Sequence, residues 1–241
     1  MRRWNRKQKV LRNLLLCVLL GTAAYVLLGF PPYTTGQKLD RLERTYMLED
    51  LEPVYTEAAR HRRDDQWFGQ WYTLVIARSP QGDYATSSWE QGGLKVQADV
   101  WPDKIGQSGL CRVWGDQLYA AADGLRGAAS ATMEVETKRQ TFTLEGQRVA
   151  DGVFSFSYLS PDHQYDHYAH NQDAPSGPGL DLLDAVDLWY WEKVGPSSYI
   201  LDGGQEMLCT VTARDEAGEP LPEVKLTVSV HELEVQTYYR W

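Results

Sequence analysis

The chain has 241 residues, of which 43% are hydrophobic, and it carries 24 Lys or Arg against 33 Asp or Glu, a formal net charge of -9. This length and apolar content allow one large domain or two small ones with a buried core, and they exclude extensive disorder. An acidic surface repels phosphate backbones, so the composition also excludes nucleic acid as a partner.

The N-terminus joins a basic cluster to an apolar run. Residues 1–12 contain several Lys and Arg and no acid, and residues 14–30, LLLCVLLGTAAYVLLGF, are almost unbroken apolar sequence. Such a run lies at the short end of what crosses a bilayer as a helix. With the positive-inside rule it predicts a cytosolic segment at 1–12, a transmembrane signal anchor in the lipid bilayer at 13–30, and export of the rest. The sequence therefore predicts a single-pass cell-membrane protein of a bacterial envelope with an extracytoplasmic C-terminal domain.

Two alternatives to this uncleaved anchor stay open. A cleavable signal peptide would use residues 14–20 as its apolar region and Thr22 and Ala24 as the small residues of the cleavage site. A lipoprotein would use Cys17, although the residue before it, Leu16, is larger than lipidation sites require.

Residues 31–66 are predicted as a short helical stalk beside the membrane. Thr34 and Gln37 have the spacing of a capping box, and the apolar residues of the segment 39–54 recur near a 3.6-residue period. Pro53 favours a division into two helices, the second over residues 53–61. A dimerising helix is the alternative, but the heptads are too few for a coiled coil.

Residues 67–241 change to a period of two and are predicted as a β-rich extracytoplasmic domain. Short alternating segments separated by turn signals favour antiparallel sheets in a sandwich or barrel. A break near residues 123–127 would divide the domain into two modules. The predicted strands are WYTLVIAR, YATSSW, LKVQADVW, LCRVW, QLYAAA, SATMEVE, QTFTLEG, VFSFSYL, LWYWEKV, SSYIL, LCTVTARD, VKLTVSV and ELEVQTYYRW. The predicted fold class is thus mainly β: a transmembrane helix, a helical stalk and a β-sandwich-like ectodomain.

Residues 209–230, CTVTARDEAGEPLPEVKLTVSV, carry a local resemblance. Asp215 can accept hydrogen bonds from nearby amides, Gly218 can supply a positive φ, and Pro220 presets the chain leaving the turn. The segment resembles the strand, turn and strand of bacterial immunoglobulin-like modules of the invasin and intimin type. The resemblance implies a β-sandwich with an adhesive or interaction role, and it carries over no functional residue.

The segment SPDHQYDHYAHNQD, residues 160–173, holds three of the five histidines. On a helix, His163, His167 and His170 would share one face, and three imidazoles can hold Zn²⁺ with a coordination position left for water. This predicts a metal site for a surface hydrolase. The alternative is a helix whose tyrosines face the core and whose histidines face water.

Aromatic residues are frequent, with nine Trp and fourteen Tyr in the chain. One interpretation is that these rings fill the space between two sheets. The other is an exposed platform that stacks on sugars, for which Trp189 and Trp191 on one face of a strand are the candidates. An envelope protein or a wall polysaccharide is then the expected partner.

Cys111 and Cys209 lie in predicted strands and are candidates for a disulfide, worth about 4 to 5 kcal/mol by loop entropy. Two buried thiols are the alternative. The sequence lacks a Gly-x-Ser-x-Gly elbow, a phosphate-binding Gly loop and a His-Glu-x-x-His motif. It therefore favours binding over catalysis, with no cofactor other than the zinc considered above. A surface hydrolase and a structural subunit of a membrane complex are the alternatives.

Overall fold

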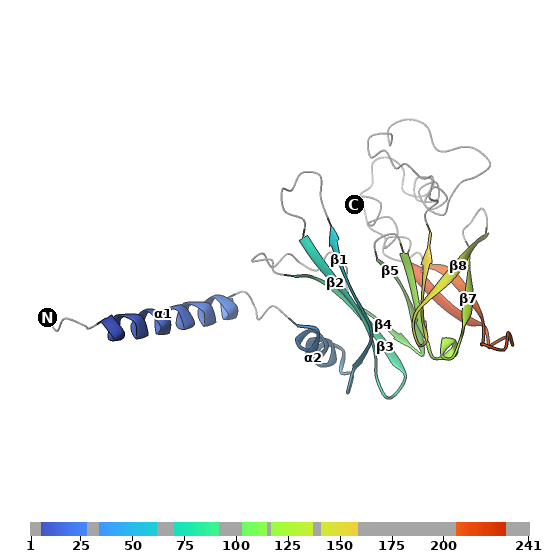
Figure 1. The fold of residues 1–241 in the computed structure, drawn as a ribbon. Coiled ribbons are helices and arrows are strands. Elements are labelled where there is room, and N and C mark those ends of the chain that lie inside the picture. The colour runs from blue at the N-terminus through green and yellow to red at the C-terminus, as the bar shows by residue number, and fades with distance from the viewer. Residues whose placement is uncertain are drawn as a thin grey trace, which may run out of the picture.

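The computed structural model describes residues 6–27, 34–61, 70–91, 103–114, 117–136, 141–158 and 206–229 (Figure 1). Two helices, one 3-10 turn and eleven strands occur in these ranges. In chain order they are α1 (Arg6–Leu27), α2 (Thr35–Tyr46), β1 (Glu52–His61), β2 (Gln70–Arg78), β3 (Asp83–Gln91), β4 (Lys104–Gln107), β5 (Gly109–Trp114), β6 (Gln117–Ala122), η1 (Asp123–Leu125), β7 (Ser130–Glu136), β8 (Thr141–Ala150), β9 (Val153–Ser157), β10 (Glu206–Arg214) and β11 (Val224–Ser229). The mainly β composition that the sequence predicted is confirmed.

The strands form two antiparallel sheets. Sheet A has the order β1-β2-β3-β4, and sheet B has the order β11-β10-β7-β8-β9-β6-β5. The chain passes from sheet A to sheet B between β4 and β5, where Ser108 adopts a positive φ of 60°. The two edge strands of sheet B, β11 and β5, lie against each other, so sheet B is nearly a closed barrel that packs beside sheet A (Figure 1).

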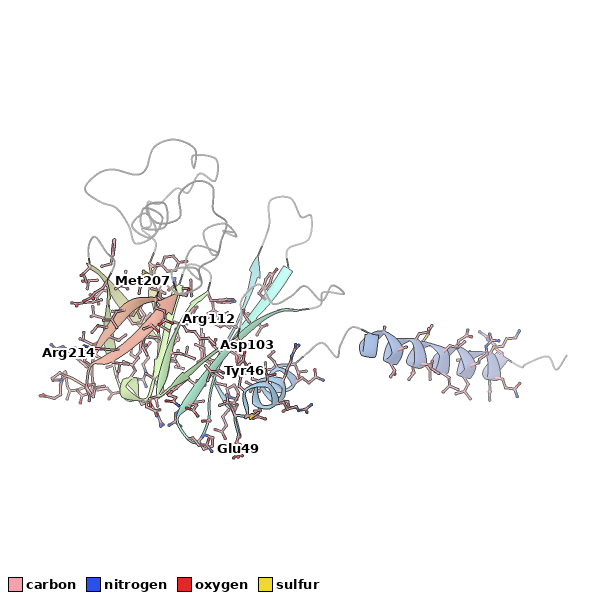
Figure 2. The ribbon with its side chains drawn as sticks, turned by 180° about the vertical axis from the view of Figure 1, so that it is seen from behind. Tyr46, Glu49, Asp103, Arg112, Met207 and Arg214 are labelled. Atoms are coloured by element: carbon pink, nitrogen blue, oxygen red, sulfur yellow. The ribbon has the colours of Figure 1, made fainter. Side chains whose placement is uncertain are left out.

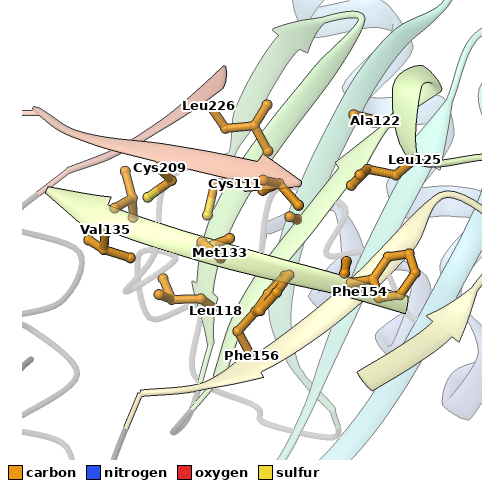
Figure 3. Close-up of a cluster of buried hydrophobic side chains, with 14 of the residues drawn as sticks. Cys111, Leu118, Ala122, Leu125, Met133, Val135, Phe154, Phe156, Cys209 and Leu226 are labelled. Carbon is orange, nitrogen blue, oxygen red and sulfur yellow. The ribbon is translucent and has the colours of Figure 1, made fainter. Parts of the chain in front are cut away.

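Three hydrophobic clusters divide the molecule into layers. The barrel core lies inside sheet B, the intersheet core lies between the two sheets, and the helix-side core lies between sheet A and α2 (Figure 3 shows the first). Strand β6 contributes Leu118 and Ala120 to the barrel core and Tyr119 and Ala121 to the intersheet core. It is therefore buried on both faces.

Burial patterns along the strands follow from these layers. β5 and β6 are buried at almost every position, whereas β7 and β10 alternate between buried and exposed residues. A strand between two layers can be apolar throughout, while a strand with one wet face must alternate. Figure 2 marks the two ends of β10 with Met207 and Arg214, and it marks buried Arg112 on β5.

Helix α2 forms where the sequence predicted a helix. The Thr34 hydroxyl accepts a hydrogen bond from the amide of Gln37 at 3.2 Å, which caps the N-terminus. Leu39 and Leu42 are buried against sheet A. Lys38 is also buried, and its ammonium lies 3.5 Å from the Asp103 carboxylate. The first helix of the predicted stalk is thus packed on the β domain.

The predicted helix at residues 53–61 is wrong, because this segment is strand β1. Its backbone pairs with β2 from Glu52 to His61, with an irregularity between Pro53 and Tyr55. Proline is tolerated at the first position of a helix, but equally at the start or bulge of an edge strand. The pairing with β2, a contact that local propensity does not record, decides between helix and strand here.

The predicted transmembrane anchor is also not borne out. Within the ranges given above, no helix is both long and apolar enough to cross a membrane. Helix α1 begins at Arg6 and takes the basic residues as far as Arg12 into its first two turns. These charged residues shorten the apolar part of the helix within residues 6–27. The predicted fold class with a transmembrane anchor at residues 13–30 is therefore wrong, and so is the predicted single-pass cell-membrane location. Residues 28–30 lie outside the described ranges.

The remaining predictions on the fold divide in two. The turn after β10 is confirmed: the Asp215 carboxylate accepts hydrogen bonds from the amides of Ala217 and Glu219, both at 2.9 Å, and Gly218 has a φ of 84°. Four predicted strands, LKVQADVW, LWYWEKV, SSYIL and ELEVQTYYRW, lie outside the described residues. Near residues 123–127, the chain makes the turn η1 between β6 and β7, two strands of the same sheet B.

Candidate functional site

Most of the candidate residues from the sequence lie outside the described part of the chain. This applies to His163, His167 and His170 and to Trp189 and Trp191, so the zinc site and the aromatic platform stay predictions. Among the residues that the structure does describe, no group of three or more His, Cys, Asp or Glu could hold a metal ion.

The two cysteines are described. Cys111 on β5 and Cys209 on β10 are buried thiols that belong to the barrel core (Figure 3). The structure therefore places both predicted partners in one cluster, and the disulfide stays a prediction.

A polar cleft of about 400 Å³ lies where the start of β1, the β2–β3 turn and the residue after η1 come together with the turn between β8 and β9. Charged side chains dominate its wall, and three of them are carboxylates and two are guanidinium groups. The lining residues are Asp50, Glu52, Val54, Arg78, Ser79, Pro80, Tyr84, Arg126 and Asp151. They come from the loop before β1 and the start of β1, from the end of β2, the β2–β3 turn and the start of β3, and from the turns that follow η1 and β8.

The inner wall of the cleft is formed by three hydrogen-bonded side chains that join the two sheets, Arg78, Tyr84 and Asp123, which we call the tie. Arg78, the last residue of β2, donates two hydrogen bonds to Asp123 of η1, from Nε to Oδ1 at 2.7 Å and from Nη2 to Oδ2 at 3.1 Å. Tyr84 of β3 donates its hydroxyl to the same Oδ1 at 3.1 Å, and its ring lies 5.9 Å from the Arg78 guanidinium carbon. Such a side-on arginine–carboxylate pair fixes both groups in one geometry.

The tie also fixes protonation states. Hydrogen bonding to Arg78 lowers the pKa of Asp123 and raises the pKa of Arg78, so both stay charged at neutral pH. Burial, followed by the hydrogen bond to Asp123, raises the pKa of Tyr84 to about 12. Close packing holds the arrangement, because a Cβ atom at Gly82 would lie 3.0 Å from Asp123 Oδ2.

The outer wall repeats the pattern on sheet B. Asp151 accepts hydrogen bonds from the Gly127 amide at 2.9 Å and from the side chains of Arg126 and Arg148, each at 3.3 Å. The pKa of Asp151 is lowered, chiefly because the Gly127 amide donates to it. The Asp151 carboxylate thus stays ionised, and it accepts a hydrogen bond from Nε of the Arg126 guanidinium.

Two further carboxylates at the cleft differ from these. Asp50 and Glu52 are exposed, and neither forms an ion pair with another residue of the described ranges. Asp50 adopts a positive φ of 51°, which an Asp tolerates better than most side chains. Both acids are therefore available to a ligand, whereas the cleft's two guanidinium groups are already held by Asp123 and Asp151.

A second polar tie joins the sheets farther along β1. The Glu57 carboxylate accepts hydrogen bonds from the hydroxyls of Tyr55 at 2.7 Å and of Tyr119 at 2.5 Å. The two rings stack with centroids 5.7 Å apart. Burial and the hydrogen bond to Glu57 raise the pKa of both tyrosines. These rings lie between the sheets, as the first interpretation of the aromatic content expects.

The sequence did not predict the cleft. Arg78 and Asp123 are 45 residues apart, and each looks unremarkable locally: an arginine that ends a strand and an aspartate followed by glycine in a turn. Two Asp-Gly pairs that are typical of turns, at residues 123–124 and 151–152, lie at the site. Neither pair indicates the partner of its aspartate.

No protein-family model matches the chain, and neither the curated proteins nor the solved structures yield a match. The cleft itself is therefore the basis for the proposal that follows.

Proposed function

We propose that this β-rich domain is a non-catalytic binding domain that takes a cationic side chain of a partner protein into the cleft between its sheets. The observation that carries the proposal is the pair of exposed carboxylates, Asp50 and Glu52, beside guanidinium groups that are already paired. A lysine or arginine side chain of a partner finds unoccupied acceptors there. An anionic group finds few donors that are not already engaged.

Charge supports the same partner class. The cleft wall carries three carboxylates against two guanidinium groups, and the whole chain has a formal net charge of -9. Both the local and the long-range field therefore attract cations, which raises association rates and discriminates against acidic partners.

Fixed protonation states support binding over catalysis. A general acid or base works best with a pKa near the operating pH. Among the described cleft residues, the pKa values of Asp123 and Asp151 are lowered and that of Tyr84 is raised, away from neutrality in each case. These groups are suited to hold a charge in place rather than to transfer a proton.

The immunoglobulin-like resemblance agrees with an interaction role, and we include a β-sandwich of that type in the proposal. Its support is the turn at residues 215–218, in which Asp215 accepts the amide hydrogen bonds and Gly218 has the positive φ that turn chemistry predicts. Two packed antiparallel sheets provide the scaffold, and the cleft provides the contact surface.

The test is an NMR titration of the ¹⁵N-labelled full chain with the acetylated and amidated tripeptide Gly-Lys-Gly. We expect concentration-dependent shifts of amides around the cleft, such as those of Ser79, Gly82 and Gly127. The neutral counterpart Gly-Gln-Gly should produce little change, because it cannot pair with Asp50 or Glu52. Equal shifts with both peptides, or shifts confined to another surface, would overturn the proposal.

Two charge-matched variants distinguish a site from general attraction. Asp50→Asn with Glu52→Gln removes two charges at the cleft, and asparagine tolerates the positive φ at position 50. Glu134→Gln with Glu136→Gln removes two charges from exposed positions of β7. Since an exposed ion pair contributes roughly 0.5 kcal/mol, we expect the first variant to weaken lysine-peptide binding about three- to tenfold and the second to leave it nearly unchanged. Equal weakening by both would reduce the effect to net charge.

A further inference from the structure

Cys111 and Cys209 occupy the place where sheet B closes on itself. Cys111 lies on the edge strand β5, and Cys209 lies on β10, next to the other edge strand β11. Both side chains are 0% exposed and point into the barrel core, where Figure 3 shows their sulfur atoms in the same part of the cluster.

Contacts across the seam bring these strands together. Leu226 of β11 is the direct antiparallel partner of Cys209. Leu226 also packs on β5, because a Cβ atom built at Gly109 would lie 3.1 Å from its Cδ2 atom. Gly109 precedes Cys111 by two residues, and residues two apart on a strand share a face. One leucine therefore links the neighbourhoods of the two cysteines.

A hydrogen bond supports the same closure from outside the barrel. Lys104 of β4 donates from Nζ to the backbone oxygen of Thr227 on β11 at 3.1 Å. β4 continues directly into β5, so this contact holds β11 beside the strand that carries Cys111. The seam has no ladder of backbone pairs between β11 and β5 in the described sheet order, and side chains carry it.

We propose that Cys111 and Cys209 are a redox-convertible pair that closes the seam of sheet B covalently. In the structure they are thiols. With a low-molecular-weight disulfide such as oxidised glutathione, one cysteine thiolate attacks a sulfur of the oxidant and releases one reduced thiol. The second cysteine, as its thiolate, then attacks the resulting mixed disulfide and releases the other. The two cysteines together lose two protons and two electrons, and the oxidant is reduced to two thiols.

Burial determines when the reaction occurs. Neither sulfur is accessible in the folded protein, so oxidant must meet the cysteines before the barrel closes or while it is open. The bond would connect β5 to β10, which are far apart in the sequence. It would raise the free energy of unfolding chiefly by restricting the unfolded chain.

The experiment uses the full chain with Cys17→Ser, which removes the exposed third thiol. The protein is unfolded in urea, refolded with excess oxidised glutathione or with a reductant, and then denatured and alkylated. We expect two alkylated cysteines in the reduced sample and none in the oxidised sample, with a mass loss of two hydrogens and no glutathione adduct. Alkylatable thiols, glutathione adducts or covalent dimers in the oxidised sample would each overturn the proposal.

A second measurement separates the bond from an effect of the oxidant. The urea midpoint of the Cys17→Ser protein should rise on oxidation. The same protein with Cys111→Ala retains a single cysteine and should have one midpoint under both conditions, even if the cavity makes it less stable. A rise in both proteins, or in neither, would contradict a bond across the seam.

Discussion

Replacing Tyr84 by phenylalanine tests the tie at the cleft wall. Tyr84 is 1% exposed, and its hydroxyl donates to the Asp123 carboxylate at 3.1 Å. Phenylalanine keeps the ring in the intersheet core and removes this hydrogen bond. A hydrogen bond to a charged group contributes about 1.5 to 3 kcal/mol. Since the Asp123 side chain is 39% exposed and also bound by Arg78, we expect the lower value. Tyr84→Phe should therefore lower the free energy of unfolding at pH 8 by about 1.5 kcal/mol.

The pH dependence sharpens this prediction. The pKa of Tyr84 is raised from 10.0 to about 12 in the folded protein, so between these values the unfolded chain loses the phenol proton and the folded protein keeps it. The contribution of this group is fully present below pH 10 and is lost as the pH rises through 12. A shift of two pH units corresponds to about 3 kcal/mol. The wild type loses about 1.4 kcal/mol per pH unit between these pKa values, so its stability curve and that of Tyr84→Phe should meet and cross near pH 11.

Urea unfolding followed by tryptophan fluorescence from pH 8 to pH 12 provides the assay. Tyr55 and Tyr119, whose pKa values are also raised, titrate in both proteins and cancel in the difference. In an Asp123→Asn background, the effect of Tyr84→Phe at pH 8 should shrink, since a neutral acceptor forms a weaker hydrogen bond. A stability difference that stays constant up to pH 12, or that is equal in both backgrounds, would refute the tie.

Two further substitutions test the packing of the layers. Lys38→Met should destabilise the protein by about 3 kcal/mol, because it leaves the Asp103 carboxylate beside a buried apolar side chain; Lys225→Met, at a 64% exposed lysine, should change stability by less than about 1 kcal/mol. Gly146→Ala would place a Cβ atom 2.6 Å from Phe156 Cε1, so we expect a loss of about 2 kcal/mol from overpacking. Urea unfolding measures the free energy of unfolding of each variant. If Lys38→Met were as stable as Lys225→Met, or Gly146→Ala as stable as the wild type, the packing of these layers would be wrong.

Short segments bounded by turn signals, alternating or apolar throughout, predicted the described strands of sheet B well, and local patterning failed at β1. The segment PVYTEAARH combines a β-branched and aromatic start with an alanine-rich end, so its intrinsic preference is divided. Pairing with β2 over its whole length decides the outcome. The capping signal at Thr34 succeeded because the Gln37 amide that it satisfies is only three residues away.

The cleft could not be predicted in the same way, since each of its charged pairs joins different elements. Arg78 meets Asp123 only when the end of β2 is placed against η1, and Arg126 meets Asp151 only when η1 lies beside the turn after β8. A charge pattern on one helix or strand can indicate such a pair from spacing. A charged pair between two sheets depends on how the sheets pack, and the spacing of residues in the sequence does not indicate that packing.

The layering itself was more accessible than the cleft. LCRVW and QLYAAA, in β5 and β6, are apolar at nearly every position, whereas SATMEVE in β7 alternates. Continuous apolar sequence in an antiparallel sheet indicates burial on both faces, so a second layer has to cover β5 and β6. Polar side chains within those two strands, such as Arg112 and Tyr119, must then face that layer. Tyr119 does so through Glu57 of sheet A, so the position of this phenol in the intersheet contact follows from sequence patterning.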